Sequence, residues 1–245
     1  MKIVHLYPEL LNLYGEAANL LVLQRTLQAA GHAVDVEAVA LGEPLHLNHV
    51  DFVYAGAGTE RKLELARRAL LPYASELQSA AADGVPMLFT GSAADLTART
   101  LQLPSGEALP CLGLTDCDAV RTDGRQLGDV LYESPMSEQL LAGFINKSGY
   151  LQHVAAPLFH ARFGPGGILT DNGAEAPDEG IRTGNVLATY AIGPVLARNP
   201  WLKRWLAAWL IERKTGQAVS ISGETEHSDR AYEITVSELL KRANS

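Results

Sequence analysis

The regular alternation of apolar runs with amphipathic, helix-length segments limits what this chain can fold into. Residues 3–7 form an apolar run, and residues 15–31 place apolar side chains on one helical face. Residues 34–38 alternate apolar and acidic side chains, as in an edge strand, whereas residues 50–55 are largely apolar, as in a central strand. Strands that alternate with helices in this way predict a mostly parallel α/β sheet flanked by helices.

The next segment predicts a sharp turn at the carboxyl edge of that sheet. Residues 61–82 have a helical pattern that Pro72 must kink or split. Residues 85–90 read as another strand, and the small residues Gly91, Ser92 and Ala93 follow directly, before a short helix. A strand, a tight turn and a helix form the geometry of a nucleophile elbow, which presents one side chain at the edge of a sheet.

The second half has more turn signals and predicts short antiparallel strands added to the sheet. We expect these strands within residues 112–120 and 130–133, with a turn at residues 164–167. Residues 185–190 read as a late strand, and a loop with Gly193 and Pro194 follows.

The C-terminal part predicts two helices. Asn199 is a suitable N-cap for a helix that Gly216 ends, with Trp201, Trp205 and Trp209 at helical spacing. We expect these rings mainly in the core, with a partner-binding face as the alternative. Residues 1–217 are therefore predicted to form one domain, and residues 218–245 a tail whose amphipathic helix packs on that domain or on a partner.

Charge and cysteine content exclude several classes of function. The chain has 20 Lys+Arg against 28 Asp+Glu, a formal net charge of -8, so we expect no nucleic-acid or membrane partner. Its start resembles neither a signal peptide nor a membrane span, which predicts a cytoplasmic protein. Cys111 and Cys117 lack neighbouring ligands at metal spacing, and His153 and His160 lack a partnering carboxylate or thiol at such spacing. No metal and no cofactor are predicted.

Several short motifs in order resemble a known family. The chain is similar to the class I glutamine amidotransferase-like proteins of the cobyric acid synthase group, most of all to the glutamine amidotransferase subunits of lipid II isoglutaminyl synthase. The resemblance implies a flavodoxin-like α/β fold and a Mur-ligase-like partner subunit, with which such subunits amidate the D-glutamate of the peptidoglycan stem peptide. The motifs that carry it are Tyr7-Pro8-Glu9-Leu10, Asn12-Leu13-Tyr14-Gly15, Gly56-Ala57-Gly58-Thr59-Glu60, Gly84-Val85-Pro86-Met87-Leu88, Gly143-Phe144-Ile145-Asn146, Asn185-Val186-Leu187-Ala188-Thr189-Tyr190 and Gly193-Pro194.

Two positions that the resemblance marks as catalytic carry residues without the required chemistry. In the family a cysteine thiolate on the elbow attacks the carboxamide carbon of glutamine, and here that position is Gly91. The family's histidine, which accepts and returns the proton, corresponds to Ile192. Because nucleophile and base are missing together, no catalytic residue is intact. A nucleophile relocated to Ser92 is a weaker alternative, and rescue by Cys111 or Cys117 is weaker still.

The remaining site motifs are also altered. The resemblance implies a glycine-rich loop whose N–H groups approach the oxyanion, and Ala57 replaces one glycine there. Lys147 and the absence of an arginine shortly after Gly149 make glutamine a doubtful ligand, whereas Asn146 is retained. The candidate ligand-binding residues are Gly56, Gly58, Thr59, Gly91, Ser92, Asn146 and Gly149.

Three functions follow as hypotheses. The first is a catalytically degenerate amidotransferase-like subunit that binds a Mur-ligase-like, ATP-dependent partner. The second is an active glutamine-hydrolysing subunit with relocated catalytic residues. The third is a sensor that binds a small anion at the emptied elbow, where Gly91 and Ser92 leave room at a helix N-terminus. Peptidoglycan and corrinoid pathways, and the oligomeric state, stay open.

Overall fold

Parallel strands from both ends of the chain form the part of the sheet that carries the elbow. The computed structural model describes residues 1–222 and 226–244. Strands β1 (Lys2–Leu6), β2 (Asp35–Val39), β3 (Phe52–Ala55), β4 (Met87–Thr90) and β13 (Val186–Thr189) pair in parallel in the order β13-β4-β3-β1-β2. This is the flavodoxin-like strand order. The predicted α/β class, the edge position of β2 and the central position of β3 are confirmed.

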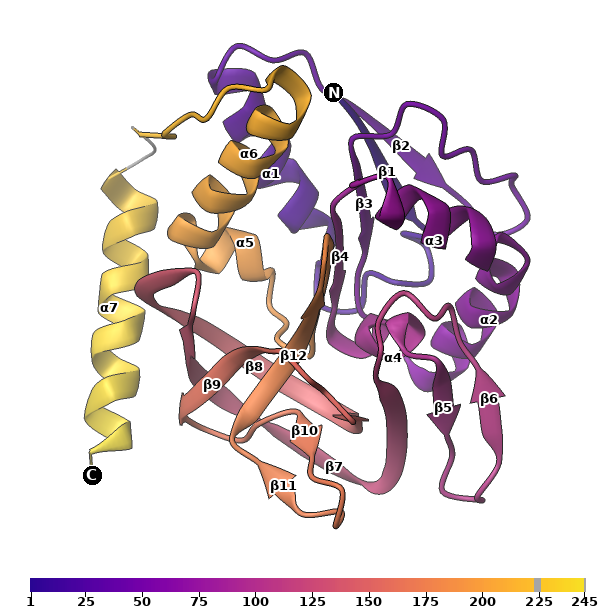
Figure 1. The fold of residues 1–245 in the computed structure, drawn as a ribbon. Helices are drawn as coiled ribbons and strands as arrows, with labels where there is room; N and C mark the ends of the chain where they lie inside the picture. Colours follow the sequence, from indigo (N-terminus) through magenta and orange to yellow (C-terminus); the bar gives the residue numbers. More distant parts are fainter. Residues whose placement is uncertain (223–225, 245) are drawn as a thin grey trace.

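Helices cover both faces of this parallel region (Figure 1). Helices α1 (Ala17–Ala29), α5 (Val195–Arg198) and α6 (Pro200–Thr215) pack on the face that presents Ile3, Phe52 and Leu88. Helices α2 (Glu60–Leu70) and α3 (Ala74–Ala82) pack on the face of the alternate residues, such as Val53 and Phe89. The central strands β3 and β4 are buried on both faces because helices cover both.

Local signals account for where these helices begin and end. The short 3₁₀ segment η1 (Leu71–Tyr73) contains Pro72 and separates α2 from α3, as the proline predicts. Gly216 ends α6 in the left-handed region, with φ of 73°. Asn199 is the N-cap residue of α6, as predicted, but its side chain does not cap the helix. Asn199 makes no cap hydrogen bond, and its amide instead pairs with the backbone N–H and carbonyl of Ala142, at 2.8 and 2.9 Å.

Antiparallel strands extend the sheet beyond β13. They are β12 (Asp178–Thr183), β9 (Pro157–Phe163), β7 (Asp118–Ser134) and β8 (Ser137–Gln152), with the short strands β10 (Ile168–Leu169) and β11 (Glu175–Ala176) at the far edge. Strands β5 (Thr100–Gln102) and β6 (Ala108–Pro110) form a hairpin that pairs with β7.

The prediction of only short strands in this half is wrong. Strands β7 and β8 have 17 and 16 residues and form one long hairpin. Asp123-Gly124 resembles a turn in the sequence, but here the segment is an irregularity inside β7, between Arg121 and Gln126. Long-range pairing with β8 therefore overrides a local turn signal. The predicted strand at residues 112–120 begins only at Asp118.

The tail helix packs on the antiparallel half of the sheet (Figure 1). Helix α7 (Glu226–Ala243) buries Leu239 against Leu131 and Ala142, and the Tyr232 hydroxyl donates to the Leu140 carbonyl at 2.7 Å. Residues 223–225 of the polar segment before the helix, and residue 245, lie outside the described residues. The division at residue 217 stays a prediction. In the part of the chain that is described, no helix is both long and apolar enough to cross a membrane.

Candidate functional site

The predicted elbow forms at the carboxyl end of β4. Gly91 has φ of 59°, in the left-handed region that favours glycine, and the chain turns there into the 3₁₀ segment η2 (Gly91–Ala93) and the short helix α4 (Ala94–Thr97). The backbone thus keeps the sharp strand-to-helix turn that presents a nucleophile in other proteins, although Gly91 has no side chain to present.

Two apolar side chains fill the space above Gly91. A Cβ atom built on Gly91 would lie 2.6 Å from the Ala57 Cβ and 2.7 Å from the Ile192 Cγ2. Ile192 is 2% exposed, and its N–H donates to the Phe144 carbonyl at 2.8 Å. The two positions that the resemblance marks as catalytic therefore lie side by side, and the side chains that fill the space between them are apolar. The expected room for an anion at the elbow is absent, and α4 is only four residues long.

The hydroxyl of Ser92 is hydrogen-bonded to Gly58 in the loop of residues 56–58. It accepts a hydrogen bond from the Gly58 N–H at 3.0 Å and donates to the Gly58 carbonyl at 2.8 Å. A serine nucleophile needs a base that takes its proton. Ile192, at the position that the resemblance marks for the base, cannot accept a proton, and no histidine lines the cavity beside Ser92.

A buried carboxylate lies beneath the elbow. Glu16 Oε2 accepts from the Thr90 hydroxyl at 2.7 Å and from the Tyr54 hydroxyl at 3.0 Å, while Asn19 donates to it at 3.2 Å. Oε1 has no hydrogen-bond partner. Burial raises the pKa of Glu16, and the hydrogen bonds from Thr90 and Tyr54 oppose that shift. No local sequence pattern marks Glu16, because its two hydroxyl partners, Tyr54 and Thr90, come from β3 and β4.

Most candidate ligand-binding residues surround one small cavity. Its volume is about 80 Å³, below the roughly 300–1,000 Å³ of typical ligand pockets. Gly58, Thr59, Ser92, Asn146 and Gly149 line it, and Gly56 and Gly91 do not. A Cβ on Gly56 would lie 2.5 Å from the Leu11 carbonyl, so packing of the backbone accounts for that glycine. The other lining residues are Leu13, Tyr14, Ala57, Glu60, Asp95, Arg121, Arg125, Lys147, Ser148 and Tyr190.

Thr59 and Asn146 already have partners within the chain. The Thr59 side chain caps α2 by accepting from the Lys62 N–H. Asn146 Oδ1 accepts from Arg125 at 2.7 Å, and Arg125 also pairs with Glu60. Glu60 additionally accepts a bond from Ser148 at 3.4 Å.

The sequence analysis looked for an arginine after Gly149 and missed two that β7 supplies. Arg125 lies in the irregular stretch of β7, and bulges of this kind re-aim side chains next to sites. Arg121 pairs with Asp95 at 3.1 Å. Both guanidinium groups are neutralised by a carboxylate, so the cavity has no unpaired arginine. Only the β7–β8 pairing brings these arginines to Asn146, and no local pattern predicts it.

Further buried titratable groups line the cavity or lie close to it. Burial raises the pKa of Asp95, which Arg121 and the Tyr190 hydroxyl counteract. Burial also lowers the pKa of Lys147 to about 8, and the Lys147 ammonium lies 3.3 Å from the centre of the Tyr150 ring. The pKa of Glu179 rises to about 7 for the same reason.

The cysteines and histidines lie away from the elbow chemistry. Burial raises the pKa of Cys111 to about 12 and that of Cys117 to about 11, so both stay protonated thiols at neutral pH. His153 pairs with Asp118 and His160 with Asp178, so the two histidines have separate partners. Within residues 1–222 and 226–244, no three metal-ligating side chains gather into a cluster.

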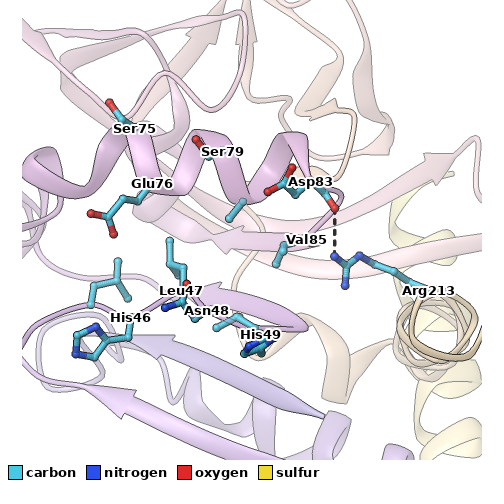
Figure 2. Close-up of a pocket in the computed structure, with 13 residues that line it drawn as sticks. His46, Leu47, Asn48, His49, Ser75, Glu76, Ser79, Asp83, Val85 and Arg213 are labelled. Atoms are coloured by element: carbon cyan, nitrogen blue, oxygen red, sulfur yellow. Dashed lines mark hydrogen bonds between the residues drawn. The ribbon is translucent and has the colours of Figure 1, made fainter.

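A larger cavity lies at the opposite edge of the sheet. It has about 590 Å³ and lies between the loop of residues 45–50 and α3, with Arg213 at one end (Figure 2). Arg213 donates to the Asp83 carbonyl at 3.3 Å. None of the candidate site residues lines this cavity, so its volume says nothing about the elbow.

The strand order and the elbow are those expected of a class I glutamine amidotransferase-like protein. The chain belongs to the family of CobB/CobQ-like glutamine amidotransferase domains, which it matches over residues 2–200. Among solved structures, a glutamine amidotransferase superposes with a TM-score of 0.56 at 19% identity, over 85% of this chain and 97% of that one. The Thermotoga maritima glutamine amidotransferase gives a TM-score of 0.52 at 14% identity, over 99% of this chain and 97% of that one. These likenesses show the fold.

Two relatives have the same description, that of a subunit of lipid II isoglutaminyl synthase. The lipid II isoglutaminyl synthase (glutamine-hydrolyzing) subunit GatD of Staphylococcus aureus is 29% identical over 245 residues, which is 100% of this chain and 96% of the relative. The corresponding subunit of Streptococcus pneumoniae is 27% identical over 225 residues, 90% of this chain and 84% of the relative.

Proposed function

We propose that this chain is a catalytically degenerate amidotransferase subunit that binds a Mur-ligase-like, ATP-dependent partner and takes part in amidating a cell-wall precursor. The observation that carries the proposal is the apolar contact at the elbow. The position of the nucleophile is Gly91, the position of the base is Ile192, and a Cβ at the first would lie 2.7 Å from the Cγ2 of the second. Acyl transfer needs a nucleophile and a proton acceptor, and neither is present at this place.

The relatives support the cell-wall part of the proposal. Both are subunits of lipid II isoglutaminyl synthase, which favours peptidoglycan over corrinoid amidation. The likeness to the Staphylococcus aureus subunit extends through the whole chain, which supports a role as a subunit for this chain as well. A partner ligase would then take its ammonia or another amine from solution.

The geometry favours this reading over the other two. In the active-enzyme reading Ser92 or a cysteine replaces the nucleophile, but the Ser92 hydroxyl is bonded to Gly58 and both thiols are buried. In the anion-sensor reading the elbow holds a pocket, but Ala57 and Ile192 fill that space.

A glutaminase assay tests the proposal. Release of ammonia and glutamate from glutamine would be measured for the pure full chain, alone and with its Mur-ligase-like partner, beside the Staphylococcus aureus relative as a positive control. We expect no turnover by this chain in either assay. Turnover that Ser92→Ala, Cys111→Ser or Cys117→Ser abolishes would overturn the degenerate reading.

A second measurement addresses the partner. We expect the native protein to co-purify with a Mur-ligase-like subunit. Purification from its own cells with no such ligase in the complex would contradict that part of the proposal.

A further inference from the structure

Ser92 and Gly58 form a reciprocal pair of hydrogen bonds across the site. The Gly58 N–H donates to Ser92 Oγ at 3.0 Å, and the same hydroxyl donates to the Gly58 carbonyl at 2.8 Å. Ser92 directly follows the elbow glycine, and Gly58 belongs to the loop between β3 and α2. One side chain therefore satisfies both backbone polar groups of a single loop residue.

This pair occupies the N–H of Gly58, which lies in the loop whose N–H groups the resemblance implies would face a ligand oxygen. Of the loop that contains Gly56, Ala57 and Gly58, the Gly58 peptide is the one bonded to the residue after the elbow. An oxyanion or carbonyl oxygen is stabilised by N–H donors at about 2.7–3.1 Å. The Gly58 N–H already has an acceptor at that distance, and an incoming oxygen would have to displace it.

The Ser92–Gly58 hydrogen bonds are a separate feature from the missing nucleophile and base. Gly91 and Ile192 remove the reacting groups, whereas Ser92 acts on the backbone of the loop. It is also distinct from the apolar contact with Ala57, because that contact involves the methyl group of the neighbouring residue. A chain could regain a cysteine and a histidine and still lack the donor.

We propose that Ser92 is a positioning residue that holds the glycine loop against the elbow and withholds the Gly58 N–H from an amide or carboxylate ligand. This inference rests on the proposed loss of glutaminase activity and deepens it. In addition to the loss of the nucleophile and the base, the Gly58 N–H of the site is occupied by the Ser92 hydroxyl. Removal of the hydroxyl frees the donor without adding any reactive group.

Hydrogen exchange in the otherwise unchanged full chain tests the pair directly. Exchange of the backbone amides in peptides covering residues 56–60 would be followed by mass spectrometry for the native chain, Ser92→Ala and Ser105→Ala. Ser105 is the matched control, because its hydroxyl bonds a backbone N–H in an exposed turn far along the chain. We expect Ser92→Ala to raise the Gly58 exchange rate about tenfold or more, with Ser105→Ala unchanged. Equal rates in all three proteins would overturn the proposal.

A reconstructed site tests the consequence for chemistry. The variant Ala57→Gly/Gly91→Cys/Ile192→His would be compared with the same variant carrying Ser92→Ala. We expect glutamine hydrolysis to be at least about tenfold faster with Ser92→Ala, since one oxyanion donor is worth about 10²–10³ in rate. Alkylation of the introduced thiol by iodoacetamide needs no such donor and should differ by less than about twofold.

The outcomes separate this inference from the proposed function. Equal hydrolysis in both reconstructed variants, or none with Ser92→Ala despite a reactive thiol, would contradict the role of Ser92. If the reconstructed variants do not fold, the exchange experiment decides by itself. Glutamine hydrolysis by the native chain would instead refute the proposed function, and the exchange rates of Gly58 would still report on the pair.

Discussion

At the scale of single residues, Gly91 meets two constraints at once. Its φ of 59° is costly for any residue with a side chain, and the space for a Cβ is filled by Ala57 and Ile192. A glycine required only for its left-handed φ could have free space around its Cβ position. The elbow is therefore packed around the missing side chain.

We expect Gly91→Ala to lower the free energy of unfolding by about 2–5 kcal/mol. The left-handed φ contributes about 1–2 kcal/mol, and overpacking against the two methyl groups contributes about 1–3 kcal/mol. Gly106→Ala is the matched control, because Gly106 has φ of 86° and no atom within 4 Å of its Cβ position. It should cost only about 1–2 kcal/mol. Urea unfolding measures both.

The packing part of this prediction has its own test. Adding Ala57→Gly to Gly91→Ala removes the contact at 2.6 Å and should recover about 1 kcal/mol or more relative to the sum of the single variants. Strict additivity of the two substitutions would show that the elbow is not packed as described.

At the scale of elements, α7 is held to the sheet by a small apolar cluster and a few polar contacts. Leu239 is 6% exposed and packs with Leu131 and Ala142, and Arg204 of α6 pairs with Asp229 at 3.0 Å. The helix covers the β7, β8 and β9 strands, which would otherwise present apolar side chains to water (Figure 1).

We expect Leu239→Ala to destabilise the protein by about 2–3 kcal/mol, because a buried leucine is replaced by a cavity at the helix–sheet contact. Ile234→Ala on the same helix is the control. Ile234 is 55% exposed, and its loss should change the free energy of unfolding by less than about 0.5 kcal/mol. Similar effects of the two variants in thermal or urea unfolding would mean that α7 does not dock on the sheet through the face described.

At the scale of the whole molecule, buried titratable groups lie where the parallel and antiparallel parts of the sheet meet. Glu179 of β12 accepts from the Thr189 hydroxyl at 2.7 Å and from the Tyr190 N–H at 2.6 Å, so it bonds the end of β13. Burial raises its pKa from 4.5 to about 7. Ionisation of this carboxyl group is therefore harder in the folded chain than in the unfolded chain.

An acidic group whose pKa is raised on folding stabilises the folded state at pH values below its pKa in the unfolded chain. This stabilisation is lost as the pH rises through the pKa of the folded chain. The stabilisation from neutral Glu179 should be complete below pH 4.5 and should disappear as the pH rises through about 7. The free energy of unfolding of the native chain, relative to Glu179→Gln, should fall by about 3 kcal/mol over that range. Urea unfolding from pH 4.5 to 8 measures it, with the exposed Glu138→Gln as control. A pH-independent difference would contradict the assignment.

Much of the fold could be predicted from local patterns. The parallel strands, the break at Pro72 and the amphipathic tail helix were all evident, because burial of one or both faces imposes a period on the sequence. The long β7–β8 hairpin could not be predicted in this way. Asp123-Gly124 has the composition of a turn, and only pairing with β8 continues the strand through this segment.

The site was predictable in part. The resemblance marked Gly91 and Ile192 as parts of one site, and in the fold a Cβ on Gly91 would lie 2.7 Å from the Ile192 Cγ2. Arg125 and Glu16 were missed, since each acts through residues distant along the chain.

By itself, the sequence determined the alternation of strands and helices in the first half of the chain, and that neither Gly91 nor Ile192 carries a nucleophile or a base, because periodicity and residue identity are local properties. Only the tertiary structure decided that Ala57 and Ile192 fill the elbow and that Ser92 occupies the Gly58 N–H. These contacts join separate loops at the edge of the sheet, and their distances depend on how all of the strands pack together.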